Sequence, residues 1–184
     1  MANINNKNFS FDEMMVHVPL CTHKDPKKVL VVTDASEDFK AEMGKHKVDV
    51  EYGDLDLLKS KNDQEFDIII LGNNSIDELL MANINKILNT NGVLAMKTSS
   101  FHRDEQKLKD DLTLLGQSFW IAMPYSFGHT TAILASKKYH PTADINLQRS
   151  DLLDDLNYYS TEVHLSSFVF PAYIHKGLTN IAKR

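Results

Sequence analysis

The 184-residue chain is predicted to fold as an α/β protein built on an open, mostly parallel sheet. Short apolar runs alternate with helix-like segments, the order typical of parallel strands joined by crossover helices. The run at residues 66–71, Phe-Asp-Ile-Ile-Ile-Leu, is almost continuously apolar, as expected of a parallel strand buried on both faces. A hydrophobic content of 42% and a charged content of 24% suit one globular domain over residues 1–184, with no internal repeat or linker.

Six strands are predicted from β-branched or apolar runs that turn-forming residues separate. The first ends at Thr33-Asp34, and the second alternates apolar and acidic side chains. Asn91-Gly92 predicts a turn before the fourth strand, and residues 124–128 predict a turn between the last two. The predicted strands are residues 28–32, 48–52, 66–71, 93–96, 119–123 and 131–135.

Helices between the strands are predicted from capping residues and from apolar side chains at helical spacing. Ser36 can cap the first of these helices, which Gly44 ends. Ser75 and Glu78 have the spacing of a capping box for the next helix, and Pro171 favours the start of the last one. A polar helix begins near His102. The apolar faces comprise Phe39 and Met43, then Leu80, Ile84, Ile87 and Leu88, then Leu108, Leu112 and Leu115.

Composition argues against several functional classes. The chain has no run of about 18 apolar residues and no signal-peptide core at its N-terminus, so we expect no membrane partner. Cys21 is the only cysteine, which suits a reducing cytoplasm. A net charge of −5 without a basic block argues against nucleic acid. The histidines lack the spacing of a zinc site, so no metal is expected.

Two blocks of the sequence resemble spermidine synthases. Residues 156–171 contain Leu-Asn-Tyr-Tyr, then Glu-Val-His, then Ser-Phe-Val-Phe-Pro, which is similar to the family's Tyr-Tyr-Asn, Ile-His and Phe-x-Leu-Pro signature. Residues 13–32 contain Glu-Met, then His-Val-Pro-Leu, then Asp-Pro-Lys-Lys-Val-Leu-Val-Val, which resembles the start of the family's nucleotide-binding domain. The chain is identified as a shortened, divergent member of the spermidine synthase (polyamine aminopropyltransferase) family.

The resemblance covers residues 7–182 and implies a methyltransferase-like Rossmann fold with an antiparallel hairpin at the sheet edge. It also implies that the family's N-terminal β-domain is missing and that one strand-and-helix unit is lost between Tyr52 and Phe66. Because the family uses that β-domain for assembly, we expect a monomer or a weak homodimer. The apolar residues expected to supply any contact between copies are Phe168, Phe170, Tyr173, Leu178 and Ile181.

Active relatives transfer an aminopropyl group from decarboxylated S-adenosylmethionine to putrescine. After the first strand the family has Gly-Gly-Gly-Asp-Gly-Gly, whereas residues 33–38 contain no glycine that would let a cofactor approach the backbone. The resemblance makes Asp34 and Asp54 candidate cofactor-binding residues. Asp34 matches the family's Asp after a shift of two positions, and Asp54 matches either the acid that holds the ribose or the acid that recognises adenine. The structural alternatives are a favourable acid at a helix start for Asp34 and a Gly-Asp turn for Asp54.

The family's catalytic Asp, which helps to deprotonate and aim the attacking amine, aligns with Gly72. Asp77 is the candidate substitute base, although acids are also favoured in the first turn of a helix. Phe11 and Asp12 align with a Tyr-His pair that lines the family's amine site. Tyr125 lies in a rearranged version of its Tyr-Pro-Ser-Gly turn. We therefore treat Phe11, Asp12 and Tyr125 as candidate substrate-binding residues.

The residues that do match the family are mostly scaffold. We expect them to tie the C-terminal helices to the sheet by packing and hydrogen bonds. They are Tyr158, Tyr159, His164, Phe168 and Pro171.

Three functions remain open at the level of sequence. The first is a degenerate spermidine synthase-like protein, with little or no catalysis, that binds a polyamine, a nucleoside or another protein. The second is a minimal active aminopropyltransferase that uses Asp12, Asp54, Asp77 or a partner subunit. The third is another small-molecule transferase on the same fold. The residues favour the first function. We expect no tightly bound cofactor, and decarboxylated S-adenosylmethionine is the expected co-substrate of an active form.

Overall fold

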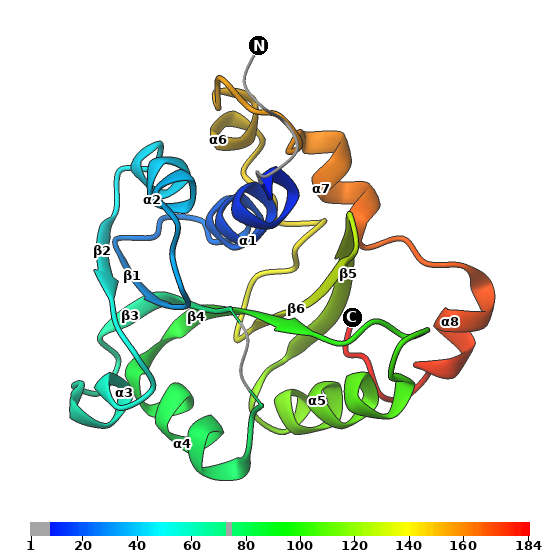
Figure 1. The fold of residues 1–184 in the computed structure, drawn as a ribbon. Helices are drawn as coiled ribbons and strands as arrows, with labels where there is room; N and C mark the ends of the chain where they lie inside the picture. Colours follow the sequence, from blue (N-terminus) through cyan, green and yellow to red (C-terminus); the bar gives the residue numbers. More distant parts are fainter. Residues whose placement is uncertain (1–7, 73–74) are drawn as a thin grey trace.

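The computed structural model describes residues 8–72 and 75–184, and these residues form a six-stranded sheet with helices on both faces (Figure 1). The strands are β1 (Lys28–Val32), β2 (Asp49–Tyr52), β3 (Phe66–Leu71), β4 (Leu88–Thr98), β5 (Ile121–Phe127) and β6 (Thr130–Ser136). The helices are α1 (Phe9–Thr22), α2 (Glu37–Gly44), α3 (Leu57–Ser60), α4 (Glu78–Ile87), α5 (Glu105–Ser118), α6 (Leu147–Asp151), α7 (Thr161–Ser167) and α8 (Ala172–Gly177).

The strand order across the sheet is β2-β1-β3-β4-β6-β5. The first four strands in this order run parallel, whereas β6 is antiparallel to β4 and pairs with β5 as a hairpin at the edge. The predicted mostly parallel sheet with an antiparallel edge hairpin is therefore confirmed. Because β1, β2 and β3 are parallel neighbours, the loops that follow them leave the sheet at the same edge.

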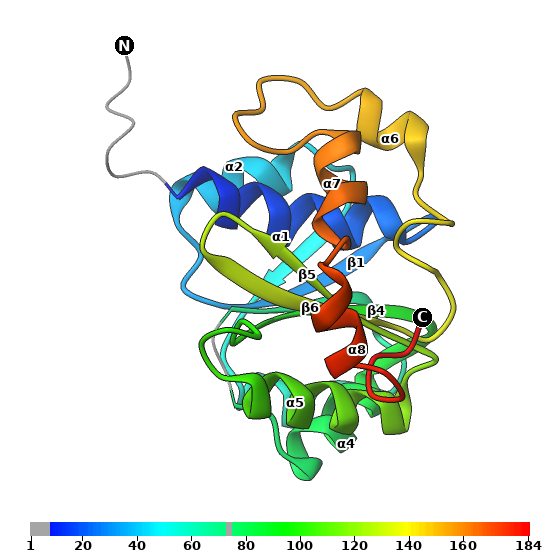
Figure 2. The same ribbon diagram turned by 90° about the vertical axis from the view of Figure 1, so that its right-hand side faces the viewer.

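Helices cover the two faces of the sheet with separate hydrophobic cores. α1, α2, α6 and α7 lie on one face, and α3, α4, α5 and α8 lie on the other (Figures 1 and 2). Strand β3 contributes Ile68 and Ile70 to the first core and Ile69 and Leu71 to the second. The continuous apolar run of β3 thus marks a strand buried on both faces, as predicted.

One predicted turn is wrong and a second is shorter than predicted, because strands continue into the residues assigned to them. Asn91-Gly92 lies within β4, where the pairing with β3 shifts register between Phe66 and Ile68. The extra residues form an irregularity of the β-bulge type instead of a turn. Pro124 belongs to β5, and only residues 128–129 turn the chain. Proline is tolerated there because β5 is an edge strand, so its missing N–H need not pair with a neighbour.

The helix caps confirm one prediction and correct another. Ser36 caps α2, its hydroxyl accepting a hydrogen bond from Phe39 N at 2.9 Å. The predicted capping box of Ser75 and Glu78 is wrong, because α4 begins at Glu78 and its cap is Asp77. A carboxylate oxygen of Asp77 accepts from Leu80 N at 2.7 Å. Asp77 therefore has the capping role that the sequence analysis assigned to Ser75.

Helix α1 was not predicted from the sequence. Every residue from Asp12 to Thr22 is buried in it, including Pro19 near its C-terminal end. A helix that is enclosed on all sides has no polar stripe, so it lacks the periodicity by which a surface helix is recognised. The single turn α3, which lies in the short connection between β2 and β3, was missed as well. No helix among the described residues has the length and apolar character needed to span a bilayer.

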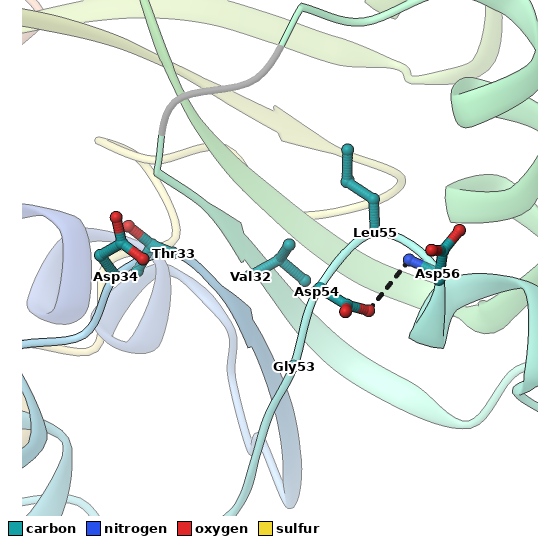
Figure 3. A pocket seen from close by; sticks show the side chains of 7 residues that line it. All are labelled: Val32, Thr33, Asp34, Gly53, Asp54, Leu55 and Asp56. Atoms are coloured by element: carbon teal, nitrogen blue, oxygen red, sulfur yellow. Dashed lines mark hydrogen bonds between the residues drawn. The ribbon is translucent and has the colours of Figure 1, made fainter.

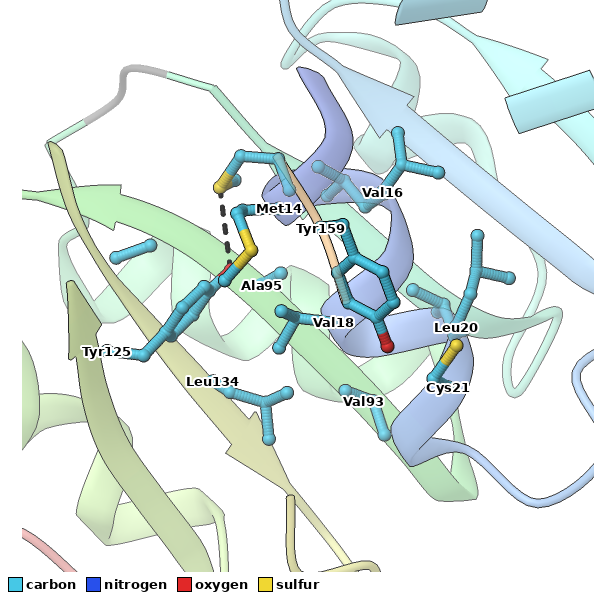
Figure 4. Close-up of a cluster of buried hydrophobic side chains, with 14 of the residues drawn as sticks. Met14, Val16, Val18, Leu20, Cys21, Val93, Ala95, Tyr125, Leu134 and Tyr159 are labelled. Carbon is cyan, nitrogen blue, oxygen red and sulfur yellow. Dashed lines mark hydrogen bonds between the residues drawn. The ribbon is translucent and has the colours of Figure 1, made fainter. Parts of the chain in front are cut away.

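Three of the predicted scaffold residues, Tyr159, His164 and Phe168, are buried, whereas Pro171 is exposed. The Tyr159 hydroxyl donates to His164 Nδ1 at 3.0 Å, because His164 Nε2 donates to the Pro141 carbonyl at 3.1 Å. Tyr159 lies against α1 in the core beside Cys21 (Figure 4). Phe168 is buried and stacks on Tyr125.

Glu13 joins the two sequence blocks that carry the family resemblance. Its carboxylate accepts three backbone hydrogen bonds, from Asn157 N and Tyr158 N at 2.8 Å and from Tyr159 N at 2.7 Å. The side chain belongs to α1, whereas its three donors lie in the segment before α7. One buried carboxylate thus fixes the N-terminal helix to the C-terminal segment.

Candidate functional site

A groove of about 600 Å³ lies at the carboxyl ends of β1 and β2 (Figure 3). The two loops that form it meet because the strands before them are parallel neighbours. The structure therefore brings together Asp34 and Asp54, the two candidate cofactor-binding residues. The groove is lined by Val32, Thr33, Asp34, Gly53, Asp54, Leu55 and Asp56.

The acidic side chains of the groove are only partly neutralised. One oxygen of Asp54, Oδ1, accepts from the backbone N–H group of Asp56 at 3.1 Å (Figure 3). It also accepts from the N–H group of Leu57 at 3.1 Å, and the two bonds orient the carboxylate. Asp56 pairs with Lys59 at 2.6 Å. Asp34 is exposed and has no ion pair among the described residues. This arrangement favours a cationic ligand or a ligand with hydroxyl donors over a phosphate.

Gly72, which follows β3, is tightly enclosed by Thr33. A Cβ atom placed on Gly72 would lie 1.8 Å from Thr33 Oγ1 and 2.4 Å from Thr33 Cβ. The Gly72 N–H donates to the Val32 carbonyl at 3.1 Å, which holds the two strand ends together. No side chain, a catalytic carboxylate included, fits at position 72 unless Thr33 moves.

Asp77 is held as the cap of α4, and it does not line the groove. The residues that connect it to Gly72 include positions 73–74, which lie outside the described residues. The sequence interpretation of Asp77 as a favourable acid at a helix start thus matches its observed hydrogen bond. Its role as a substitute base stays a hypothesis.

The N-terminal end of α1 brings Phe11 and Asp12 to the same edge of the sheet. Ser36 Oγ donates to Asp12 Oδ2 at 3.4 Å, which places this carboxyl beside the loop that carries Asp34. Asp12 is only 9% exposed, and burial is the main cause that raises its pKa, with Asp38, Glu42 and Glu13 adding to the rise. A raised pKa makes a carboxylate a stronger base than an ordinary Asp side chain.

Sequence reasoning missed Lys97, which lies at the carboxyl end of β4. Its ammonium is 5.8 Å from the centroid of the Phe11 ring, within the range of a cation–π contact. The only sequence signal for this residue was its position, a single lysine directly after the apolar residues of β4. The aromatic ring that the resemblance assigns to the amine site thus already faces a cation of the chain itself.

Tyr125 lies in the protein core, away from the groove lining. It lies among buried side chains of the core (Figure 4) and is fully buried itself. Its hydroxyl donates to Met15 Sδ at 3.6 Å, and its ring stacks on Phe168 with centroids 5.1 Å apart. Burial raises the pKa of this phenol. In this conformation the hydroxyl is not available to a ligand. Within the described residues, no cluster of three or more His, Cys, Asp or Glu side chains could hold a metal ion.

No family model matches the chain. Curated proteins named polyamine aminopropyltransferase do match it along most of its length. The protein from Agathobacter rectalis is 25% identical over 220 positions, covering 90% of this chain and 76% of that protein. The protein from Clostridium beijerinckii is 24% identical over 225 positions, covering 94% of this chain and 79% of that protein.

Solved structures agree with these sequence matches. Spermidine synthase from Thermotoga maritima has a TM-score of 0.83 at 23% identity and covers 94% of this chain and 75% of that chain. A spermidine synthase in complex with the transition state analogue AdoDATO has a TM-score of 0.85 at 22% identity, with the same coverage.

These matches in sequence and fold support the assignment of the chain to the polyamine aminopropyltransferase family. Its methyltransferase-like fold is the fold of these relatives. The 220-position alignment is longer than the chain of 184 residues, so this relative has segments within the matched region that this member lacks. The chain is therefore shorter than this relative within the region that the two share.

Proposed function

We propose that the chain is a degenerate spermidine synthase-like protein that binds a polyamine or nucleoside ligand with little or no aminopropyl transfer. The observation that carries this proposal is the contact between Gly72 and Thr33. The position aligned with the family's catalytic Asp has no side chain, and Thr33 fills the volume that a side chain would need. Loss of general-base assistance alone typically lowers a rate by about 10²–10⁴.

The groove supports weak binding of a cation. Asp34 and Asp54 are exposed, so their attraction for a polyamine is screened by salt over about 8–10 Å. The free Oδ2 of Asp54 can accept a hydroxyl hydrogen bond from a nucleoside. The described lining of the groove comes from the end of β1 and from the two loops that follow β1 and β2, and we expect no tightly bound cofactor.

One observation favours a second candidate, a minimal aminopropyltransferase that uses decarboxylated S-adenosylmethionine. Asp12 has a buried carboxyl with a raised pKa beside Phe11, at the amine end of the site. It has the properties of a general base, whereas Asp77 is engaged as a helix cap. If the chain is active, Asp12 is therefore the stronger candidate for the substitute base.

The catalytic test is mass spectrometry of purified protein incubated with putrescine and decarboxylated S-adenosylmethionine. We expect no spermidine above the protein-free background. Asp12→Asn and Asp77→Ala are the informative variants, and Asp110→Asn on the exposed face of α5 is the matched control. Wild-type turnover that disappears in Asp12→Asn and persists in the other two variants would establish the minimal enzyme instead.

The binding test is calorimetry with spermidine at low and at physiological ionic strength. We expect weak binding that fades with salt, and a loss of about two- to fivefold in affinity for Asp54→Asn at low salt. Asp110→Asn again serves as the control, because it removes the same charge away from the groove. Tight, salt-independent binding of methylthioadenosine would contradict this description of the groove.

A further inference from the structure

A second cavity, of about 440 Å³, lies at the opposite end of the sheet from the groove. Its walls come from the segments that precede β1 and β2, from α6 and from the residues that follow α6. Apolar side chains, among them Leu152 and Leu153, line part of it. The charged residues and the histidine that line it are Asp25, Lys27, Lys45, Lys47, Arg149 and His46.

Positive charge predominates in this cavity, although the whole chain has a net charge of −5. Lys27 pairs with Asp25, and Lys45 pairs with Glu42, both at 2.8 Å. The guanidinium of Arg149 donates to backbone carbonyls at the end of α1, which leave its charge unneutralised.

Lys47 has no hydrogen bond or ion pair among the described residues. Arg149 and Lys47 therefore leave two cationic side chains at the cavity without a carboxylate in direct contact. An anion would meet both at this end of the sheet.

Three side chains behind the cavity wall form a continuous hydrogen-bonded chain. His46 Nε2 and His17 Nδ1 are 2.8 Å apart, and His17 Nε2 lies 2.9 Å from Glu42 Oε2. Burial acts to raise the pKa of Glu42, but the hydrogen bonds from His17 and Lys45 outweigh it and lower that pKa. Glu42 is therefore an ionised carboxylate that can only accept hydrogen bonds.

The carboxylate fixes the tautomers along this chain. His17 Nε2 carries a hydrogen because it donates to Glu42, so the Nδ1 atom of neutral His17 accepts from His46 Nε2. His46 Nδ1 is left with a lone pair, and no described residue makes a hydrogen bond to it. The side chain of this residue is only partly accessible, the residue being 8% exposed, and it lines the cavity.

An anion in the cavity would change the protonation of this chain. A proton taken from solvent at His46 Nδ1 allows the Nε2 proton to pass to His17 Nδ1. The positive charge then lies on His17 beside Glu42, and His46 Nδ1 becomes a donor that faces the anion. The charged and titratable groups facing the two imidazoles are Glu13, Glu42, Lys45, Arg149, Tyr159 and His164.

We propose that this cavity binds a small organic phosphate and that binding draws one proton from solvent onto the His46–His17–Glu42 chain. The phosphate meets Lys47, Arg149 and the new donor of His46, while the organic part packs on Leu152 and Leu153.

The two imidazoles stay neutral without a ligand. Burial is the main cause that lowers the pKa of His46 to about 3, and the neighbouring His17 and the charge of Arg149 act in the same direction. A neighbouring negative charge raises the pKa of a histidine by roughly 1–3 units, and a dianion raises this pKa further.

Calorimetry with phenyl phosphate tests binding, and sulfate serves as a second probe because its charge is constant between about pH 5.5 and 8, the range in which histidine responds. We expect sulfate to bind more tightly at the lower pH. Titrations in two buffers of different ionisation enthalpy should show proton uptake. Lys47→Ala should weaken binding of both probes by roughly fivefold, the effect of one partly screened charge. Lys86→Ala, which removes an exposed lysine of α4, should leave binding unchanged.

His46→Gln separates the proton linkage from the electrostatic attraction. The glutamine amide can still donate to His17 Nδ1, so the fold should persist, as thermal unfolding would verify. We expect this variant to bind sulfate without proton uptake and without a preference for low pH. Absence of binding by the wild type, equal losses in Lys47→Ala and Lys86→Ala, or proton uptake that survives in His46→Gln would each overturn the proposal.

Discussion

At the ends of β3 and β1, the side chain of Thr33 occupies the space that a side chain at Gly72 would need. A Cβ at position 72 would lie well inside contact distance of two Thr33 side-chain atoms. A substitution at either residue therefore changes the packing of the other. Placing an Asp at position 72 requires a second substitution, at Thr33. The sequence shows the missing carboxylate, but only the structure shows why the position is closed to it.

Gly72→Asp should destabilise the fold by about 1–3 kcal/mol, because it overpacks a closed site. The double variant Thr33→Gly/Gly72→Asp should recover much of this loss, since the nearest remaining Thr33 atom is the backbone Cα at 3.3 Å. Urea unfolding measures both effects. Gly44→Asp is the control, because a Cβ there meets nothing within 4 Å.

Gly72→Asp alone should not yield spermidine, since residues 33–38 still lack glycine for a close approach of the cofactor. A single variant as stable as the wild type would show that Thr33 yields easily. Spermidine production by that variant would show that the cofactor loop is competent.

At the scale of elements, a helix or strand could be predicted where its local sequence pattern determines it. Strand β3 is apolar on both faces and α2 has a serine cap, and both were predicted from local sequence. Helix α1 is enclosed by the sheet, α2, α6 and the C-terminal segment, so its apolar content has no helical period. Its existence depends on contacts that are distant in sequence.

In the candidate site, too, some residues could be placed from the sequence and others could not. Asp34 and Asp54 could be placed together because parallel strand order determines which loops meet. Lys97 could not be assigned to Phe11, because that contact depends on where the unpredicted α1 lies. Tyr125 was placed in a turn, and the continuation of β5 through Pro124 carries it into the core instead.

The histidine of α7 should make stability depend on pH. Burial lowers the pKa of His164 to about 4, whereas an unfolded histidine titrates near 6.5. Below about pH 6.5 the unfolded chain binds a proton that the folded chain does not, so the free energy of unfolding falls as the pH drops toward 4.

His164→Gln should lower stability at pH 7, where the bond from Tyr159 weakens, and should also flatten the decline with falling pH. The slope should decrease by up to about 1.4 kcal/mol per pH unit, the value for one proton. Urea unfolding at several pH values measures it. His129→Gln at the exposed hairpin turn is the control. An unchanged slope in His164→Gln would mean that this histidine is protonated in the folded protein.

At the scale of the whole molecule, little apolar surface is left at the predicted contact between copies. Phe168 and Leu178 are buried in the two cores, while Tyr173 is 53% exposed and the neighbouring Val169 is 72% exposed. Stable dimers bury a larger continuous patch than two isolated side chains provide.

We therefore expect a monomer or a weak dimer in solution, which light scattering at micromolar concentration tests. Any weak dimer formed through this surface should dissociate on Tyr173→Asp. Trp120→Asp is the control, since it changes another exposed aromatic residue. A stable tetramer would show that other surfaces of this chain support assembly.

The carboxylate of Glu13 binds backbone groups that lie 144 to 146 residues further along the chain. During synthesis, the buried helix that carries it emerges from the ribosome long before those partners exist. Until they arrive, α1 offers water an apolar surface with an unmatched negative charge. Closing so long a loop is slow. Helix α1 is thus made well before the segment that completes its surroundings, and it is among the last of the described elements to reach its final packing.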